Sequence, residues 1–343
     1  MIDTLYICDS TYQIITACCV QYQFDYNAAI ILTDYLDGMQ SVSDRISEYS
    51  SLFDKSYFVE AKKYLSSQQY TNENIDYEII EFLERNELNN VNRIMIGSLD
   101  VFAKRLFKIF KNNYKKYSIC GGFIEEGTAT YNYYTELISG YKYKEDFKDI
   151  YLFEPSLLSK KTDMEIIKID NTIFNKKKYI HELNLIFDYY QLQDVYKEKF
   201  IVLASSYVEI DVFKNVDDIV EALIDAVGIE NIFVKNHPRV HDDYYYNKGI
   251  KTNVNMSVPW EIIAMNMDLS KKVIISAYSG SLFTPKVLFG KEMRGVALMD
   301  IVDQKDPFML SNYIKDYVVR RYPESFVVPN NIEEFKSILK QMK

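Results

Sequence analysis

Residues 231–239 read Asn231-Ile-Phe-Val-Lys-Asn-His-Pro-Arg239, a short apolar run that leads into a turn. The apolar part, 231–235, has the composition of a buried strand. A residue before proline is pushed out of the helical region, so we expect His237 in an extended turn just past the strand's carboxyl end. Ligands of open α/β sheets bind at that edge. Lys235 and Arg239 would suit a phosphate-bearing ligand there, although a surface turn with chance basic residues fits the same letters.

Strand and helix patterns alternate on both sides of this turn. In the second half the predicted strands are 200–204, 231–235 and 272–276, and the predicted helices are 216–227, 260–265, 281–289 and 332–342. In the first half the predicted strands are 5–8, 28–33, 56–59, 92–97 and 117–124, and the predicted helices are 11–22, 41–53, 74–86, 99–114 and 128–138. Strands separated by helices indicate βαβ units and a mainly parallel sheet. The sequence therefore predicts an α/β protein with two Rossmann-like domains that face each other across a cleft.

The length of 343 residues exceeds the usual size of one hydrophobic core, which also favours two domains. Residues 1–155 are the predicted amino-terminal domain and residues 199–343 the carboxyl-terminal one. Residues 156–198 have a looser pattern with basic patches, and we interpret them as the connecting segment, with a strand of their own at 165–169. The last helix could pack back on the first domain.

Charge and cysteine content limit the classes of protein to consider. A net charge of -9 argues against a nucleic-acid surface, which is normally basic. The four cysteines, Cys8, Cys18, Cys19 and Cys120, have apolar neighbours and no metal-ligand spacing, which is typical of buried thiols in a reducing compartment. The first residues lack the basic region of a signal peptide, and no apolar window is long enough to span a membrane, so we expect a cytoplasmic protein.

Two adjacent acids and a glycine, Glu125-Glu126-Gly127, follow the predicted strand 117–124 at another carboxyl edge. Adjacent carboxylates repel each other, which should raise the pKa of one of them and let it act as a general base near neutral pH. The alternative is that both acids are solvated and stabilise the amino end of helix 128–138.

A serine-rich turn, Ser276-Ala-Tyr-Ser279-Gly280-Ser281, joins a predicted strand to a predicted helix. Its hydroxyls and free amides could bind an anion. Turns of serine and glycine are also ordinary connections in α/β proteins, so the turn alone does not identify a site.

Carboxylates follow other predicted strands of the second half. Glu261, in Pro259-Trp260-Glu261, could accept hydrogen bonds from a ribose diol, or could simply carry a charge near a helix start. Glu209 and Asp211 come after strand 200–204, where either could reach the cleft or lie in solvent.

Several familiar motifs are missing. No GxGxxG follows the first strand and no GxxxxGK[ST] occurs, so dinucleotide and P-loop sites lack support. His237 and His241 are four residues apart, but Pro238 argues against the helix that zinc ligation at this spacing needs. The sequence has no GxSxG of a serine hydrolase. Because no Asp-x-Asp follows a strand, we expect no metal and an activity that survives chelation.

Taken in order, the motifs resemble those of bacterial sialyltransferases. Glycosyltransferase families 52 and 80, the bacterial polysialyltransferases and the streptococcal capsule sialyltransferases share an acid-acid-Gly, then Lys-x-His-Pro, then Pro-x-Glu, then a serine-rich turn. The matching residues here are Glu125-Glu126-Gly127, Lys235-Asn236-His237-Pro238, Pro259-Trp260-Glu261 and Ser279-Gly280-Ser281. The resemblance covers both halves at motif level and is nearest to the family 52 lipooligosaccharide or capsule type.

The resemblance implies a GT-B transferase that uses CMP-sialic acid as donor, inverts the anomeric carbon and needs no metal or other cofactor. The acceptor would be a hydroxyl of a galactose-containing or sialylated glycan of surface lipooligosaccharide or capsule. The first domain would hold this acceptor and the second domain the CMP-sugar. Contact with the inner face of the membrane and a homodimer stay open.

The resemblance also implies roles for single residues. His237 would protonate or stabilise the leaving phosphate. Glu126, with Glu125 beside it, would deprotonate the acceptor hydroxyl, or Asp211 or Glu209 would do so if the second domain supplies the base. The residues implied in CMP binding are Lys235, Pro238, Glu261, Ser276, Ser279, Gly280 and Ser281.

Two other functions stay open. A GT-B transferase with another donor, such as CDP-glycerol or a UDP-sugar, would share the His-Pro turn and the serine-rich turn. A catalytically inactive binding module would share only the fold.

Overall fold

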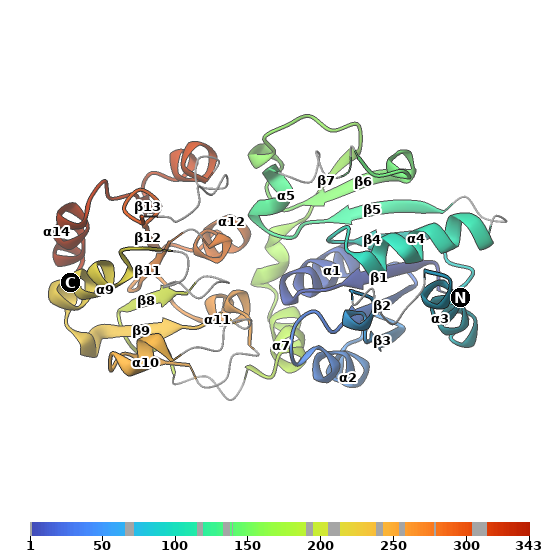
Figure 1. The fold of residues 1–343 in the computed structure, drawn as a ribbon, viewed down its shortest axis with the longest axis horizontal. Helices are drawn as coiled ribbons and strands as arrows, with labels where there is room; N and C mark the ends of the chain where they lie inside the picture. Colours follow the sequence, from blue (N-terminus) through green and yellow to red (C-terminus); the bar gives the residue numbers. More distant parts are fainter. Residues whose placement is uncertain are drawn as a thin grey trace. The chain divides into compact units, whose positions relative to one another are not determined.

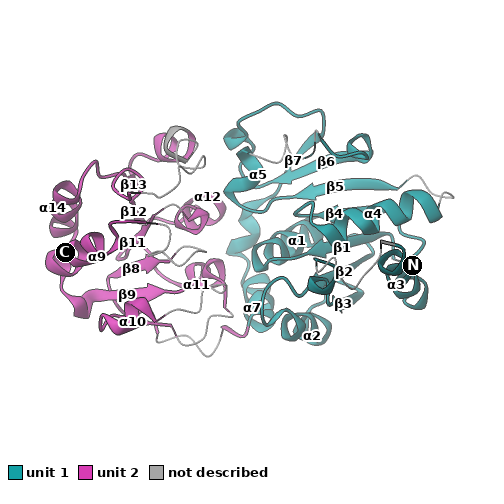
Figure 2. Cartoon of the chain, in the orientation of Figure 1, with its two compact units in different colours: residues 1–187 teal, residues 188–343 magenta. Residues whose placement is uncertain are grey.

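The computed structural model describes residues 2–65, 72–114, 119–132, 138, 140–189, 195–204, 213–237, 243–253, 258–277, 279–303 and 314–343. They form two compact units, which Figure 2 colours separately: unit 1 spans residues 1–187 and unit 2 spans residues 188–343. Each unit is a parallel sheet with helices on both faces (Figure 1), which confirms the predicted α/β class with two Rossmann-like domains.

Unit 1 is built on seven parallel strands in the order β3-β2-β1-β4-β5-β6-β7. This is the order of a doubly wound nucleotide-binding sheet with one more strand at its edge. Every residue of β1 and β2 is buried, as expected for central strands covered by helices on both faces. The strands are β1 (Thr4–Cys8), β2 (Ala28–Thr33), β3 (Lys55–Val59), β4 (Arg93–Ile96), β5 (Cys120–Ile124), β6 (Phe147–Leu152) and β7 (Glu165–Lys168).

Two helices of unit 1 begin directly after central strands. The side chain of Ser10 accepts a hydrogen bond from the backbone N–H of Gln13 and caps α1, and Asp100 caps α4 through the N–H of Ala103. These caps hold the residues after β1 and β4 at the carboxyl edge of the sheet. The helices are α1 (Thr11–Phe24), α2 (Met39–Tyr49), α3 (Asn72–Arg85), α4 (Val101–Asn113), α5 (Thr128–Asn132) and α7 (Lys177–Ile186), with 3₁₀ turns at Lys62–Leu65, Lys144–Asp146, Pro155–Leu157 and Asn171–Asn175.

Unit 2 repeats the doubly wound arrangement with six parallel strands in the order β10-β9-β8-β11-β12-β13. The strands are β8 (Phe200–Leu203), β9 (Ile232–Lys235), β10 (Lys251–Thr252), β11 (Val273–Ser276), β12 (Arg294–Ala297) and β13 (Phe326–Val327). The helices are α9 (Val216–Val227), α10 (Tyr244–Asn247), α11 (Trp260–Asn266), α12 (Thr284–Phe289) and α14 (Ile332–Met342), with 3₁₀ turns at Ile229–Asn231 and Gly280–Leu282 and a π-helix at Ile314–Val319.

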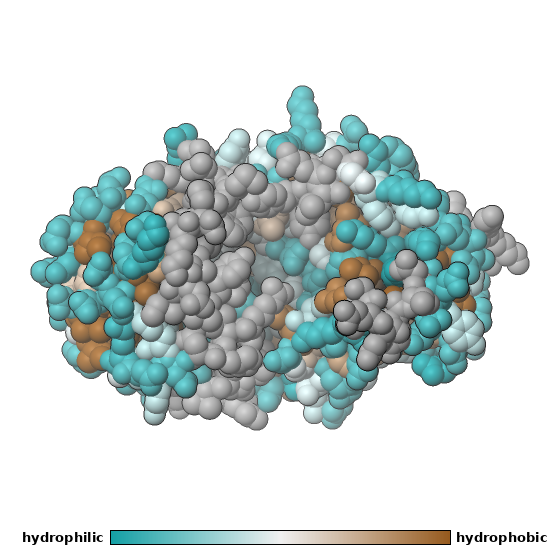
Figure 3. Space-filling view, viewed as in Figure 1, coloured by the Kyte–Doolittle hydropathy of each residue, from teal (hydrophilic) through white to brown (hydrophobic). Residues whose placement is uncertain are grey.

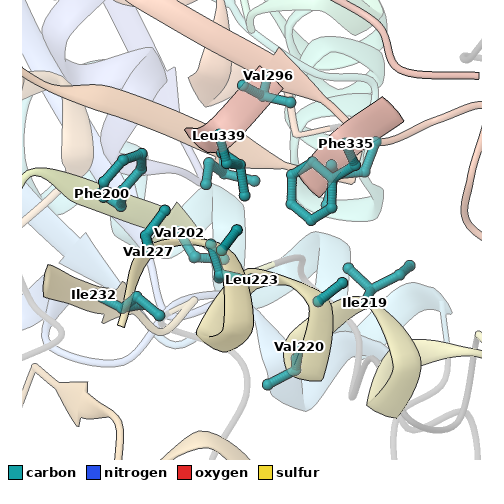
Figure 4. Close-up of a cluster of buried hydrophobic side chains, with 14 of the residues drawn as sticks. Phe200, Val202, Ile219, Val220, Leu223, Val227, Ile232, Val296, Phe335 and Leu339 are labelled. Atoms are coloured by element: carbon teal, nitrogen blue, oxygen red, sulfur yellow. The ribbon is translucent and has the colours of Figure 1, made fainter. Parts of the chain in front are cut away.

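Alternate residues of these strands point to opposite faces of the sheet. Phe200 and Val202 of β8, with Ile232 of β9, pack against α9 and α14 in one buried core (Figure 4). Lys235 and Ser276 have the other parity, and we therefore place them on the face that α11 and α12 cover (Figure 1).

The structure changes the predicted domain boundaries. Most of the predicted connecting segment, 156–198, belongs to unit 1, because β7 pairs with β6 and α7 contacts α2. The last helix, α14, packs on α9 of its own unit, and Lys336 bonds Asp225 across that contact. The physical reason is the apolar stripe that Phe335 and Leu339, both fully buried, present to the unit 2 core.

The visible surface is mixed in both units, with hydrophobic side chains in separate small patches among hydrophilic ones (Figure 3). The exposed large apolar residues that the structure describes are scattered over different elements: Tyr49, Leu65, Tyr77, Ile166, Tyr246 and Tyr317. Single exposed apolar residues are normal on a protein surface. Among the described helices, none combines the length and the apolar character needed to cross a bilayer.

Candidate functional site

The turn after β9 carries the first predicted site residues. β9 ends at Lys235, and His237 lies half-buried two residues later. The N–H of Asn236 donates to Oδ1 of Asn253 at 2.7 Å, which ties this turn to the residue after β10. His237 is therefore held past the carboxyl end of its strand, as predicted, whereas Pro238 lies outside the described residues.

Lys235 and Glu261 form a buried pair of opposite charges in unit 2. Both residues are 5% exposed. Burial lowers the pKa of the Lys235 ammonium to about 8, while the nearby Glu261 charge opposes that shift. Burial likewise raises the pKa of Glu261, and Lys235 acts to lower it. Each charge thus makes the other less costly to bury.

Glu261 also accepts hydrogen bonds from the segment after β11. Its Oε1 receives the hydroxyl of Ser281 at 3.3 Å and that of Thr284 at 3.2 Å. Glu261 is in the first turn of α11, Thr284 begins α12, and Lys235 ends β9. The structure therefore connects three of the motifs that the sequence singled out, although 49 residues separate the ends of this network on the chain (Lys235 and Thr284).

The serine-rich turn is internally hydrogen bonded. Ser276 donates to the carbonyl of Leu203 at 3.0 Å, and its Oγ accepts the N–H of Ser279 at 3.3 Å. The Oγ of Ser279 accepts the N–H of Ser281, also at 3.3 Å. The predicted helix from 281 is a 3₁₀ turn at Gly280–Leu282, followed by α12 from Thr284. These hydrogen bonds hold the serine-rich turn in place just past the carboxyl end of β11.

β9 and β11 are both neighbours of β8. Two strand spacings separate the His237 turn from the serine turn, or about 10 Å at the usual spacing of parallel strands. At this separation, side chains from both turns can reach a phosphate that lies between them.

Glu125 of unit 1 is buried, with 1% of its surface exposed. Its carboxylate accepts hydrogen bonds from the Tyr12 hydroxyl at 2.7 Å, from the backbone N–H of Phe153 at 2.8 Å, and from the Tyr131 hydroxyl. Burial raises the pKa of this carboxyl to about 7, although the three hydrogen bonds act to lower it. The pKa of Glu125 is raised, but the predicted cause was wrong: burial raises it, with a smaller contribution from the charge of Glu154 rather than from the adjacent Glu126.

Glu126 has a different environment from Glu125. It is partly exposed, and its backbone N–H donates to Oγ1 of Thr130 at 2.7 Å. Gly127 follows with φ +77°, a left-handed conformation that glycine adopts without strain. The chain therefore turns sharply after Glu126 into α5, and Glu126 stays partly exposed at this turn.

A second pair of acids, which the sequence analysis did not assign to the site, lies where the strand order of unit 1 reverses. The hydroxyl of Ser98 donates to the carboxylate of Asp9, which follows β1. The same hydroxyl also donates, over 3.3 Å, to the carboxylate of Asp100, which follows β4. Gln13 donates to Oδ1 of Asp9 at 2.5 Å. Burial and the Asp9 charge raise the pKa of Asp100 to about 6. The signal was present in the sequence, because both acids come within four residues of a strand end at the edge where ligands bind.

Two predicted carboxylates, Glu209 and Asp211, lie outside the described residues. Within the described part of the chain, no group of three or more His, Cys, Asp or Glu side chains is placed to hold a metal ion.

Comparison with known proteins gives a likeness of fold. No protein-family model and no curated protein sequence matches the chain. A solved UDP-GlcNAc 2-epimerase from Methanocaldococcus jannaschii, in complex with UDP-GlcNAc and UDP, has a TM-score of 0.58 at 15% identity and covers 100% of this chain and 92% of its own. S. aureus MnaA with UDP also has a TM-score of 0.58, at 12% identity, over 100% of this chain and 88% of its own. Apo UGT2 from Phytolacca americana reaches 0.51 at 9% identity, over 99% of this chain and 90% of its own.

The chain has the GT-B fold. The GT-B fold consists of two Rossmann-like units, and both units here have the doubly wound strand order. At these identities the likeness extends to the fold alone.

Proposed function

We propose that the chain is an inverting, metal-independent sialyltransferase that moves sialic acid from CMP-sialic acid to a hydroxyl of a galactose-containing or sialylated surface glycan. The observation that carries the proposal is the network of Lys235, Glu261, Ser281 and Thr284. It unites the Lys-x-His-Pro, Pro-x-Glu and serine motifs of the resemblance at the ligand-binding edge of one sheet. Chance surface motifs would have no reason to converge on a shared buried pair.

In this proposal unit 2 binds the CMP-sugar donor and stabilises its leaving group. Breaking the bond between the sugar's anomeric carbon and the phosphate oxygen leaves negative charge on CMP. His237, just past β9, donates a proton to that phosphate or stabilises it as an imidazolium. The Ser279 hydroxyl and the backbone amide of Gly280 hold the remaining phosphate oxygens. Ser281, whose hydroxyl and N–H already bond Glu261 and Ser279, holds the turn and Glu261 in place.

Lys235 and Glu261 position the nucleoside. Both hydroxyls that bond Glu261 reach Oε1, so we assign Oε2 to the ribose diol. Lys235 opposes the rise in the pKa of Glu261 that burial causes, and a charged acceptor binds a hydroxyl more strongly than a neutral one.

The base that takes the proton of the acceptor hydroxyl is Glu126. It is partly exposed, whereas Glu125 beside it is buried against two tyrosines and a backbone amide. Glu125, through its three hydrogen bonds, then holds the turn at residues 125–127 in place and so positions Glu126. Asp211 is the second candidate for the base, followed by Glu209.

A UDP-sugar donor is the second candidate function. Two solved structures that share the fold over the whole of this chain are complexes with UDP, one of them also with UDP-GlcNAc. The same edge of unit 2 could hold a diphosphate, since the serine turn offers hydroxyls and amides rather than a cytosine-specific contact.

A donor panel tests the proposal. The full chain is incubated with CMP-sialic acid, UDP-GlcNAc or CDP-glycerol, with and without lactose, and the released nucleotide and sialyllactose are measured by chromatography. We expect CMP release that lactose stimulates, with sialyllactose as product. Turnover of UDP-GlcNAc or CDP-glycerol alone would overturn the sialyltransferase assignment.

A further inference from the structure

Unit 2 contains a pocket of about 790 Å³ whose polar lining is dominated by cations. The residues that line it are Lys197, Lys199, Lys271, Lys272 and Arg294, one acid, Asp268, and Met267, Ser270, Val273 and Met342. The chain as a whole has a net charge of -9, so this local excess of positive charge is opposite to the average. Like charges gathered in one cavity repel one another unless an anion lies among them.

The pocket lies at the opposite edge of the sheet from the proposed donor site. Lys199 directly precedes β8, Lys272 directly precedes β11, and Arg294 is the first residue of β12. All three strands are parallel, so these residues mark their amino ends, whereas His237 and the serine turn follow carboxyl ends. The pocket is therefore a separate feature of unit 2.

Part of the positive charge has a structural role. The ammonium of Lys272 donates to the carbonyls of Tyr196, Lys197 and Glu198 at 2.9–3.0 Å and so closes the chain segment before β8. Lys199 donates to the carbonyl of Lys343 at 3.0 Å. These two lysines would be needed with or without a ligand.

Lys271 and Arg294 have no such role. Both are exposed, and the guanidinium of Arg294, unlike its backbone in the β12 ladder, forms no hydrogen bond or ion pair with a described residue. Lys271 lies near Asp268, whose pKa is lowered mainly by hydrogen bonds from Ser270 and in smaller part by the Lys271 charge. One carboxylate thus faces five cations, and the described residues leave the guanidinium of Arg294 available for a ligand.

We propose that this basic pocket binds a phosphate-bearing anion, either a free phosphorylated molecule or the headgroup of a phospholipid. Arginine and lysine together are the usual partners of phosphate oxygens, and the guanidinium can contact two of them at once. Met267, Val273 and Met342 provide apolar surface beside the cations for the carbon skeleton of such a ligand.

The test compares two double variants of the full chain with the same loss of charge. Lys271→Gln with Arg294→Gln alters the pocket, and Arg321→Gln with Lys340→Gln alters two exposed cations elsewhere in unit 2. Binding of tripolyphosphate is measured by calorimetry, and binding to vesicles of phosphatidylcholine with phosphatidylglycerol is measured by sedimentation. Any phosphate bound at the donor edge contributes equally to both variants.

We expect the pocket variant to bind at least one probe about tenfold more weakly than the control variant, because two charge-assisted contacts are lost. A loss for tripolyphosphate would assign a soluble ligand, and a loss confined to vesicles would assign a lipid headgroup. Equal binding by the two variants in both assays would overturn the proposal. Thermal melts of both variants check that each remains folded.

Discussion

The two units share a strand order but carry opposite chemistry at the edge where Rossmann-like sheets bind ligands. Unit 1 presents acids there: Asp9, Asp100, Glu125 and Glu126. Unit 2 presents Lys235, His237 and a hydroxyl-rich turn, with Glu261 as the acid that lies beside Lys235. The backbone arrangement is thus common to both, and the functional difference lies in the few side chains that follow each strand.

A buried glutamate in each unit makes the comparison sharper. Glu125 and Glu261 are 1% and 5% exposed, and burial raises the pKa of both. Glu125 is surrounded by hydroxyl and amide donors, whereas Glu261 has hydroxyl donors and the ammonium of Lys235. Unit 1 can therefore let its glutamate take up a proton near neutral pH, while in unit 2 the charge of Lys235 opposes the rise in the pKa of Glu261.

The largest expected effect comes from removing the charge partner in unit 2. Lys235→Met leaves Glu261 buried without an opposing charge and should lower the unfolding free energy of unit 2 by about 3–5 kcal/mol. Lys251→Met is the control, because Lys251 is exposed and its ion pair with Glu198 should contribute no more than about 1 kcal/mol. Denaturation followed by Trp260 emission reports on unit 2, since Trp260 is the single tryptophan of the chain.

The double variant Lys235→Met with Glu261→Gln separates lost charge pairing from lost packing. We expect it to recover part of the stability that Lys235→Met loses, because no unpaired charge remains in the unit 2 interior. A Lys235→Met protein as stable as the Lys251→Met control would show that the two charges are not coupled, and unit 2 would then differ less from unit 1 than we argue.

The next effect is kinetic and concerns the cationic edge of unit 2. His237→Ala should lower turnover of the accepted donor by about two orders of magnitude or more, because general acid catalysis contributes that much. His181→Ala removes an exposed imidazole from unit 1 and should leave turnover unchanged. Unchanged turnover in His237→Ala would remove this residue from the mechanism and leave the serine turn as the only phosphate contact at this edge.

Local features of the fold are predicted well from the sequence. The apolar runs of β2 and α9 give the bounds that the structure has, and Gly290 ends α12 in the left-handed conformation. Short-range signals of this kind depend only on neighbouring residues. The alternation of strands and helices predicted parallel sheets, and both sheets of the structure are parallel, but the order of their strands was not predicted.

Features that depend on distant residues were not predicted. β6 contains Asp149, which makes the segment look polar, but Asp149 is buried because Arg93 of β4 pairs with it at 3.2 Å. The hydrogen bond between Tyr12 and Glu125 spans 113 residues of sequence. No local pattern marks such a partner, so the sequence indicated an acid pair but not which acid is buried.

The difference between the two acids of unit 1 gives the third prediction. Glu126→Gln should lower kcat about a hundredfold, since a neutral amide cannot take the acceptor proton, while donor binding to unit 2 stays the same. Glu60→Gln is the matched control, because Glu60 is an exposed acid that directly follows β3 of the same sheet. Full activity in Glu126→Gln, with loss in Asp211→Asn, would assign the base to the second domain.

The smallest effect is the response of Glu125→Gln to pH. The ordinary pKa of 4.5 rises to about 7 in the folded chain, so the folded state binds a proton more tightly than the unfolded state does. The stability due to this group is therefore fully present below about pH 4.5 and is lost as the pH rises to about 7. Glutamine does not titrate, and its amide should cost about 1–3 kcal/mol by mismatching the three donors.

Hydrogen exchange at the backbone N–H of Phe153, which donates to Glu125, reports on local opening of unit 1. We expect its hydrogen exchange to show Glu125→Gln as the less stable protein at pH 5, with a gap that narrows toward pH 7.5 as the wild-type carboxyl ionises. A gap that widened with pH would mean that the folded chain favours the ionised carboxylate. Glu125 would then resemble Glu261 in having surroundings that favour the ionised form, and the buried glutamates would no longer distinguish the two units.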